Sequence, residues 1–340
     1  MNRPWRRRTP RPNRRLAATL AGLVGLVGVA RAEPIVTPLV ADLPGVADLA
    51  ICANGQTALA LDAARGAVVA FDPTRSGACR EVVAPPDDGL PRPAAIGCMP
   101  GDVVVTVCHG ANAWSLRSFR LRPDGVADPA APLQSLAVGE SASPPVGVAV
   151  VVSGVRDWLV VAGLPEPLPA VQRTLFAGVG LRPLATAATV VEEGWRPVAA
   201  AVSPADELVL VERPRDSAAT CWVSYHDAAG RRLLRLDTGL TRVRDVAFDR
   251  AGGRLWVVGG EPGDADRPEG LWRLDAELRR GAQGVRPTCV VRLTEPRAVV
   301  AASDEALLVA TGAPGRAILR IDPRHGRKSE DGTDGEEEGR

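Results

Sequence analysis

The sequence repeats one short pattern six times, at intervals of roughly 50 residues. Each repeat opens with an apolar run, passes through a polar turn such as Asn54-Gly55, and returns in a second run rich in Val and Leu, such as residues 103–108. Short β-favouring runs bounded by Gly, Pro, Asp and Ser predict antiparallel hairpins. The repeats begin near Pro44, Pro93, Pro145, Pro197, Val243 and Pro296. A unit of this length that recurs in this way is typical of a β-propeller.

The remainder of each repeat predicts a third and a fourth strand. Several third strands end in an Asp that precedes a turn, as at Asp72, Asp227 and Asp322. Such a side chain accepts hydrogen bonds from the backbone N–H groups of a turn, and its recurrence favours that role over a carboxylate site. The 35 Gly and 30 Pro residues exclude a long helical bundle. We therefore expect an all-β chain of four-stranded antiparallel blades.

The last repeat lacks a fourth strand, because a polar terminus follows its third. Residues 34–40 resemble the missing strand. An N-terminal strand that completes the last blade would remove the exposed edge between the first and last blades. The sequence predicts six blades closed in this way, with seven as the alternative. The third repeat is the least regular, because prolines interrupt it over residues 164–169.

Two segments of the chain resemble exported bacterial propellers of the YVTN and NHL type, whose repeats are similar to WD40 repeats. They are residues 201–211 (AVSPADELVLV) and 246–258 (VAFDRAGGRLWVV). The resemblance extends over most of residues 34–323 and implies the fold. Since such families include sensors, scaffolds, lactonases and enzyme subunits, it implies no particular activity.

Both ends of the chain differ from the repeats. Residues 1–32 combine eight arginines with a 15-residue apolar stretch and the small residues Ala30 and Ala32, the pattern of a signal peptide cleaved before Glu33. The pair Arg14-Arg15 also fits a twin-arginine signal, so both the Sec and the twin-arginine routes stay open. Residues 324–340 contain no large apolar side chain and predict a disordered acidic tail. The propeller domain is therefore expected over residues 33–323.

Charge and hydropathy exclude several partners. Removal of residues 1–32 takes away eight arginines and no acidic residue, which moves the formal charge from +1 to −7 and argues against nucleic-acid binding. No second apolar run long enough to span a bilayer follows the leader. We expect a periplasmic or secreted monomer without a transmembrane segment in the mature chain. The six cysteines could form disulfides there or remain buried thiols, and their spacing does not decide between the two.

Arginines recur where one repeat passes to the next. These connections open on one face of a propeller, where guanidinium groups could hold a carboxylate by paired hydrogen bonds. Trp195, in the same kind of connection, is the tryptophan expected to be most exposed. The alternative is that these arginines pair with nearby acidic residues such as Glu192 and Glu295. The arginines are Arg92, Arg196, Arg242, Arg244 and Arg297.

We predict that the chain is an exported binding or interaction module, with this face as its contact surface and a protein or a small anionic ligand as its partner. No catalytic site is evident, because the chain has three His, no Gly-x-Ser-x-Gly elbow and no Cys-x-x-Cys-His motif. The alternative is a metal-dependent propeller hydrolase of the lactonase or gluconolactonase type. Its divalent metal would be held by Asp62, His109 and Glu212, which follow second strands. Without that metal, no cofactor is expected.

Overall fold

The structure is a computed structural model, and it describes most of the chain beyond residue 32. The described residues are 33–43, 45–84, 91–122, 124–128, 134–143, 147–152, 158–176, 182–189, 191–215, 219–249, 254–275, 287–302 and 304–323. The predicted signal peptide, the predicted tail and the repeat boundaries at Pro44 and Pro145 lie outside them. Internal contacts divide the chain into Met1–Ala32 and Glu33–Arg340, and all described residues belong to the second unit.

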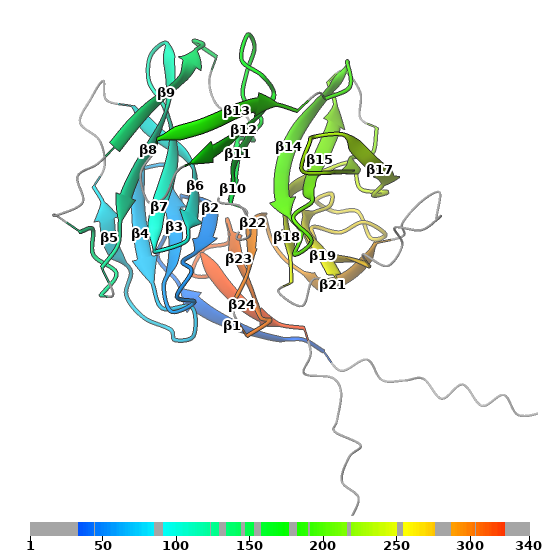
Figure 1. Ribbon diagram of the computed structural model, residues 1–340. Coiled ribbons are helices and arrows are strands. Elements are labelled where there is room, and N and C mark those ends of the chain that lie inside the picture. The colour runs from blue at the N-terminus through cyan, green and yellow to red at the C-terminus, as the bar shows by residue number, and fades with distance from the viewer. Residues whose placement is uncertain are drawn as a thin grey trace, which may run out of the picture. The chain divides into compact units, whose positions relative to one another are not determined.

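The described residues form 24 strands and no helix. The strands build six four-stranded antiparallel sheets, arranged as the blades of a propeller (Figure 1). The prediction of six blades is confirmed, and the alternative of seven is wrong. Within the described residues no helix has the length and hydropathy that a membrane span needs.

In the first three blades the strands follow the chain from the innermost outwards. Blade 1 contains β2 (Val46–Ile51), β3 (Ala58–Asp62), β4 (Ala67–Phe71) and β5 (Arg80–Val83). Blade 2 contains β6 (Arg92–Met99), β7 (Val103–His109), β8 (Ala113–Arg120) and β9 (Gln134–Glu140). Blade 3 contains β10 (Ala149–Val152), β11 (Trp158–Ala162), β12 (Val171–Phe176) and β13 (Pro183–Ala188). The proline-rich segment of the third repeat thus falls in the β11–β12 loop and leaves the blade whole.

The remaining blades repeat this order, except that the last one takes a strand from the N-terminus. Blade 4 contains β14 (Trp195–Val202), β15 (Leu208–Pro214), β16 (Trp222–His226) and β17 (Arg232–Asp237). Blade 5 contains β18 (Val243–Phe248), β19 (Arg254–Gly259), β20 (Gly270–Asp275) and β21 (Thr288–Arg292). Blade 6 contains β22 (Pro296–Ala301), β23 (Leu307–Thr311), β24 (Ile318–Asp322) and β1 (Ile35–Val40).

The N-terminal strand closes the ring as the sequence predicts. It pairs antiparallel with β24, from Ile35 opposite Asp322 to Val40 opposite Ile318. Leu39 and Val40 are buried in a cluster that also contains Ile318 and residues of blade 1. The first and last segments of the propeller therefore hold each other in place (Figure 1).

The hydrophobic core lies between blades. Each of six apolar clusters of described residues draws its side chains from two neighbouring blades. Val211 of blade 4, for example, shares a cluster with Val246 and Trp272 of blade 5. A blade packed on both faces needs continuous apolar strands, which is why all five residues of β3 are buried.

The meander of each blade separates two faces of the ring. Connections between blades and the loops between second and third strands lie on one face, here called the inter-blade face. Loops between first and second strands, and between third and fourth strands, lie on the opposite face. The turn-forming role predicted for strand-end aspartates is confirmed for two of them. Asp72 accepts a 2.7 Å hydrogen bond from the Thr74 N–H group, and Asp227 accepts one of 2.8 Å from the Arg231 N–H group.

Candidate functional site at the channel mouth

The innermost strands surround a central channel with a cavity of about 200 Å³. Residues of β2, β10, β14, β18 and β22 line it. The lining is apolar except for two carboxyl groups, those of Asp48 and Asp245. The carboxyl groups of these two aspartates are therefore the groups of the channel lining that can bind a polar ligand or transfer a proton.

Asp48 and Asp245 occupy the same position in two different blades. Each follows a β-bulge near the start of an inner strand, opposite Leu61 and Val258 respectively. The other four repeats have alanine at this position, namely Ala95, Ala149, Ala199 and Ala298. Because this position lies near the beginning of each inner strand, both carboxyl groups lie toward the inter-blade face.

Each aspartate joins its blade to the next one. Asp48 Oδ2 accepts a 2.8 Å hydrogen bond from the Ile96 N–H group of blade 2, and Oδ1 accepts one of 2.8 Å from Leu49. Asp245 Oδ2 accepts a 2.8 Å hydrogen bond from the Val299 N–H group of blade 6. Among the described residues, neither carboxyl group has an ion-pair partner.

The environment favours protonated carboxyl groups. Burial raises the pKa of Asp48 well above its ordinary value of 3.8, and the negative charge of Asp245 raises it further. Burial raises the pKa of Asp245 to about 7, although the N–H groups of Val299 and Val246 act in the opposite direction. A carboxyl group that titrates near neutral pH can donate as well as accept a proton, a property found more often at functional sites than elsewhere.

This pKa predicts a specific pH dependence of stability. Between pH 3.8 and about 7, folded Asp245 binds a proton that the unfolded chain does not. The stabilisation is therefore complete below pH 3.8 and is lost as the pH rises through about 7. We expect Asp245→Asn to be less stable than wild type at pH 5, and this deficit to shrink by about 2–3 kcal/mol by pH 8.5. Urea unfolding at both pH values measures the change.

Asp72→Asn is the matched control. Hydrogen bonds from the Thr74 hydroxyl and N–H groups lower the pKa of Asp72, so its titration ends well below pH 5. The stability difference between Asp72→Asn and wild type should stay constant from pH 5 to 8.5. A constant difference for Asp245→Asn as well would show that this carboxyl group titrates normally.

The predicted arginines all lie at or beside the first residue of an inner strand, on the inter-blade face. Arg92 and Arg242 are exposed, Arg196 is half-buried, and the part of the chain that the structure describes holds no hydrogen-bond or ion-pair partner for any of the three. The buried Nε atom of Arg196 has no acceptor among the described residues. These three guanidinium groups can therefore accept a ligand.

The other two arginines of the set are engaged. Arg244 lies 3.0 Å from Glu269, and Arg297 donates a 3.4 Å hydrogen bond to the carbonyl of Val46 and lies 3.4 Å from Glu295. Pairing with nearby acids, the alternative raised by the sequence, thus holds for these two. Arg297 also connects blade 6 to blade 1 through Val46.

Trp195 is half-buried, like Trp158 and Trp222, whereas Trp114, Trp256 and Trp272 are buried, so its rank as the most exposed tryptophan stays a prediction. Its ring meets that of Trp222 edge-on at 6.2 Å, and the Arg235 guanidinium lies 4.0 Å from its centroid. Arg235 also stacks at 5.1 Å on Trp222. The cation–π contact with Arg235 holds the indole in place, so Trp195 contributes to the packing of blade 4.

The three proposed metal ligands lie in different local settings. Asp62 Oδ1 accepts a 3.2 Å hydrogen bond from the Arg65 N–H group in the β3–β4 turn. His109 stacks on Trp114 with ring centroids 4.7 Å apart, and its buried Nε2 atom has no partner in the part of the chain that the structure describes. The strand register makes Cys108, rather than His109, the counterpart of Asp62 and Glu212, because Cys108 lies opposite Pro93 at the strand start.

Glu212 belongs to a buried polar chain within blade 4. The Ser224 hydroxyl donates to Glu212 Oε1 at 3.0 Å and lies 2.9 Å from His226 Nε2. Arg235 Nε lies 3.3 Å from Glu212 Oε2. Burial raises the pKa of Glu212 and lowers the pKa of His226. The Ser224 hydroxyl has one proton and can donate in only one of these two contacts. In the other contact it accepts, and the proton comes from Glu212 or His226.

Comparisons with known proteins establish the architecture. No protein-family model matches the sequence, and no curated protein matches it. The fold resembles a Trichoderma reesei carbohydrate-active enzyme of family AA12 at 11% identity, covering 86% of this chain and 98% of that one with a TM-score of 0.61. It also resembles the PQQ-bound aldose sugar dehydrogenase of Streptomyces coelicolor at 14% identity, covering 86% and 98% with a TM-score of 0.57. A putative gluconolactonase matches at 12% identity, covering 86% and 92% with a TM-score of 0.57.

These similarities show a β-propeller and leave the YVTN or NHL type a prediction. Enzymes of several kinds share this architecture, so the fold is compatible with an enzyme as well as with a binding protein. The activity of this chain depends on its own side chains.

Sequence reasoning missed the channel aspartates. Neither Asp48 nor Asp245 is among the candidate site residues named from the sequence. A signal was present, because an alignment of the six inner strands shows Asp twice where alanine stands four times. The polar side chain at a small-residue position near a channel axis indicates the site.

Proposed function

We propose that this chain is an exported propeller that binds a small organic anion at the inter-blade face, over the mouth of the central channel. The observation that carries the proposal is the set of Arg92, Arg196 and Arg242, which lack partners among the described residues. Guanidinium groups pair most strongly with carboxylates and similar anions, through paired charge-assisted hydrogen bonds.

The channel supports a ligand of limited size. Its volume of about 200 Å³ is below the range typical of sites for drug-sized molecules. A protonated Asp245 can donate a hydrogen bond to an anion, whereas an ionised one would repel it. The raised pKa of this carboxyl group therefore favours an acidic ligand near neutral pH.

The proposal predicts binding of hydroxycarboxylates. We expect gluconate and citrate to raise the melting temperature of the protein, and glucose, which lacks the carboxylate, to leave it unchanged. Arg196→Glu combined with Arg242→Glu should weaken gluconate binding about tenfold or more in isothermal titration calorimetry, since a charge-assisted hydrogen bond contributes ~1.5–3 kcal/mol. The affinity should fall as salt is added.

Arg75→Glu is the control for this experiment. Arg75 is exposed in the β4–β5 loop on the opposite face, so its charge reversal changes the net charge without touching the channel mouth. Equal weakening by Arg75→Glu would mean that only net charge matters. If no carboxylate binds, the proposal of a small-anion site is wrong, and a protein becomes the expected partner of this face.

A metal-dependent hydrolase is the second candidate. The observation in its favour is the buried Nε2 atom of His109, which has no hydrogen-bond partner among the described residues and could ligate a metal. Asp62, His109 and Glu212 do not lie within 4.8 Å of one another, so such an enzyme would have to draw Asp62 and Glu212 toward His109 when the metal binds. A metal that copurifies with the protein and is lost in Asp62→Asn would favour hydrolysis over binding.

A further inference from the structure

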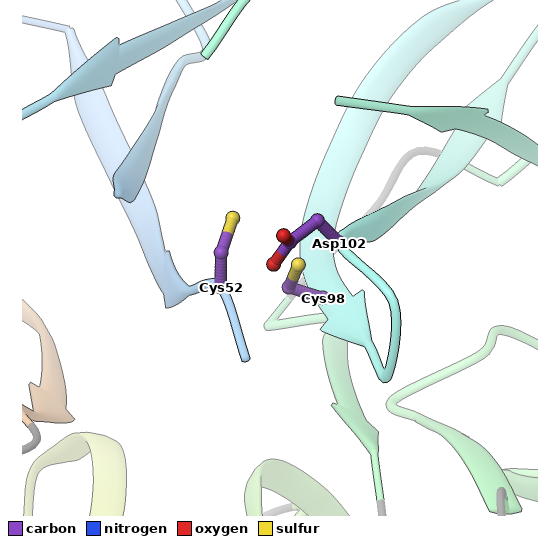
Figure 2. Close-up of side chains that lie close together, drawn as sticks. All are labelled: Cys52, Cys98 and Asp102. Carbon is purple, nitrogen blue, oxygen red and sulfur yellow. The ribbon is translucent and has the colours of Figure 1, made fainter. Parts of the chain in front are cut away.

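A cluster of two cysteines and an aspartate lies on the opposite face of the ring. It contains Cys52, Cys98 and Asp102, and their sulfur and carboxylate atoms all lie within 4.8 Å of one another. Among the described residues this is the one group of three or more Cys, His, Asp or Glu side chains close enough to share a metal ion. Figure 2 shows the three side chains gathered in one place, Cys52 on one ribbon segment and Cys98 and Asp102 on another.

The fold brings these residues together from two blades. Cys52 follows β2 of blade 1, where a turn fixes it through a 2.9 Å hydrogen bond from its N–H group to the Thr57 carbonyl. Cys98 lies in β6 of blade 2, and Asp102 lies in the tight β6–β7 turn with a φ of 58°. Because β2 and β6 are neighbouring inner strands, their ends meet at this face.

A neighbouring side chain orients the carboxylate. Asn54 donates hydrogen bonds to Asp102 from its backbone N–H group (3.3 Å) and from Nδ2 (3.2 Å). The Oδ1 atom of Asn54 in turn accepts from the Gln56 and Thr57 N–H groups at 2.8 and 3.1 Å. Supporting hydrogen bonds of this kind are typical of the residues that surround metal ligands.

The cluster places one carboxylate beside two thiols. Asp102 has no ion-pair partner in the described part of the chain. Three groups that repel each other when ionised become mutually compatible when a cation lies between them.

We propose that Cys52, Cys98 and Asp102 form a binding site for a thiophilic metal ion of the zinc class, which links blade 1 to blade 2. On binding, each thiol releases its proton to solvent, and two S–metal bonds and one O–metal bond form. Sulfur ligands select zinc over magnesium or calcium, which prefer oxygen. Three protein ligands leave a fourth tetrahedral position for water or an external ligand.

Cobalt(II) is the probe for this site, since it takes the place of zinc and absorbs light when thiolates ligate it. The full chain, reduced and freed of metal, should bind one cobalt ion and show thiolate-to-cobalt charge-transfer absorption with the visible bands of tetrahedral coordination. Zinc should displace the cobalt. Cys52→Ser and Cys98→Ser should abolish the charge-transfer band, and Asp102→Asn should lower cobalt affinity by at least about tenfold.

Two comparisons keep the test independent of folding. Asparagine tolerates the positive φ of residue 102 and can keep one of the two exposed hydrogen bonds from Asn54, so Asp102→Asn should still fold and should lower the melting temperature only slightly in the absence of metal. Cys79→Ser removes another half-buried thiol outside the cluster and should bind cobalt like wild type. Two findings would overturn the assignment. One is a reduced protein that shows no thiolate-to-cobalt band, and the other is a native Cys52–Cys98 disulfide, which would consume both ligands.

Discussion

Deletion of residues 33–40 is expected to lower the free energy of unfolding by at least about 5 kcal/mol. The deletion removes β1, exposes the edge of β24 and uncovers the cluster that contains Leu39 and Val40. Loss of a buried leucine alone typically costs ~2–5 kcal/mol. Since whole domains are stable by only ~5–15 kcal/mol, the shortened protein should be largely unfolded or aggregated. Urea unfolding and size-exclusion chromatography measure both effects.

Ile35→Thr tests whether the effect comes from closure of the ring. Ile35 lies in the same strand but is 47% exposed, so its substitution keeps the pairing and should change stability by less than about 1 kcal/mol. If the deletion is no more harmful than this substitution, the pairing of β1 with β24 does not hold the ring together.

Arg235→Ala is expected to destabilise blade 4 by about 3–5 kcal/mol, because it leaves the buried Glu212 carboxylate without its nearest counter-charge. The Glu212 side chain is 1% exposed and lies 3.3 Å from Arg235 Nε. The substitution also removes the stack on Trp195 and Trp222. Urea unfolding at pH 7 measures the loss.

A second substitution and a surface pair provide the comparison. Glu212→Gln in the Arg235→Ala background removes the unpaired charge and should recover a large part of the stability. Arg65→Ala breaks an ion pair whose side chains are 52% and 39% exposed, and should cost less than about 1 kcal/mol. An equally small loss in Arg235→Ala would mean that Glu212 is protonated without help from Arg235.

The two proposed sites can be tested separately. The arginines and channel aspartates lie toward the inter-blade face, whereas the cysteine cluster lies at first-to-second-strand turns on the opposite face. Effects of substitutions at distant sites usually add. A variant that loses cobalt binding should therefore retain gluconate binding, and the arginine variants should retain cobalt binding.

The sequence predicts many residues of the candidate site, but it does not predict which of them contact one another. The arginines could be found because strand boundaries place them on one face. Their partners could not, since Arg244 meets Glu269 and Arg297 meets Val46 only through folding. The sequence groups His109 with Asp62 because each follows a second strand. The register shows that Cys108 is the counterpart of Asp62, since Cys108 lies opposite Pro93, directly before the bulge between Pro93 and Ala95.

The architecture follows from local features of the amino-acid sequence. A pattern of hairpins that recurs six times predicts a ring of six blades. The strand that completes the last blade can be recognised in residues 34–40. These are local properties, because strand length, turn residues and apolar runs act over a few neighbouring positions. These features could therefore be recognised in the sequence without the structure.

The chemistry that the residues can carry depends on which of them the fold brings together. Asp48 and Asp245 are separated by nearly 200 residues, yet the ring places both carboxyl groups in one apolar channel, where burial raises the pKa of each. Cys52 and Cys98 become neighbours because two inner strands lie side by side. Proximity and burial depend on how the blades pack together, and for that reason no local pattern predicts them.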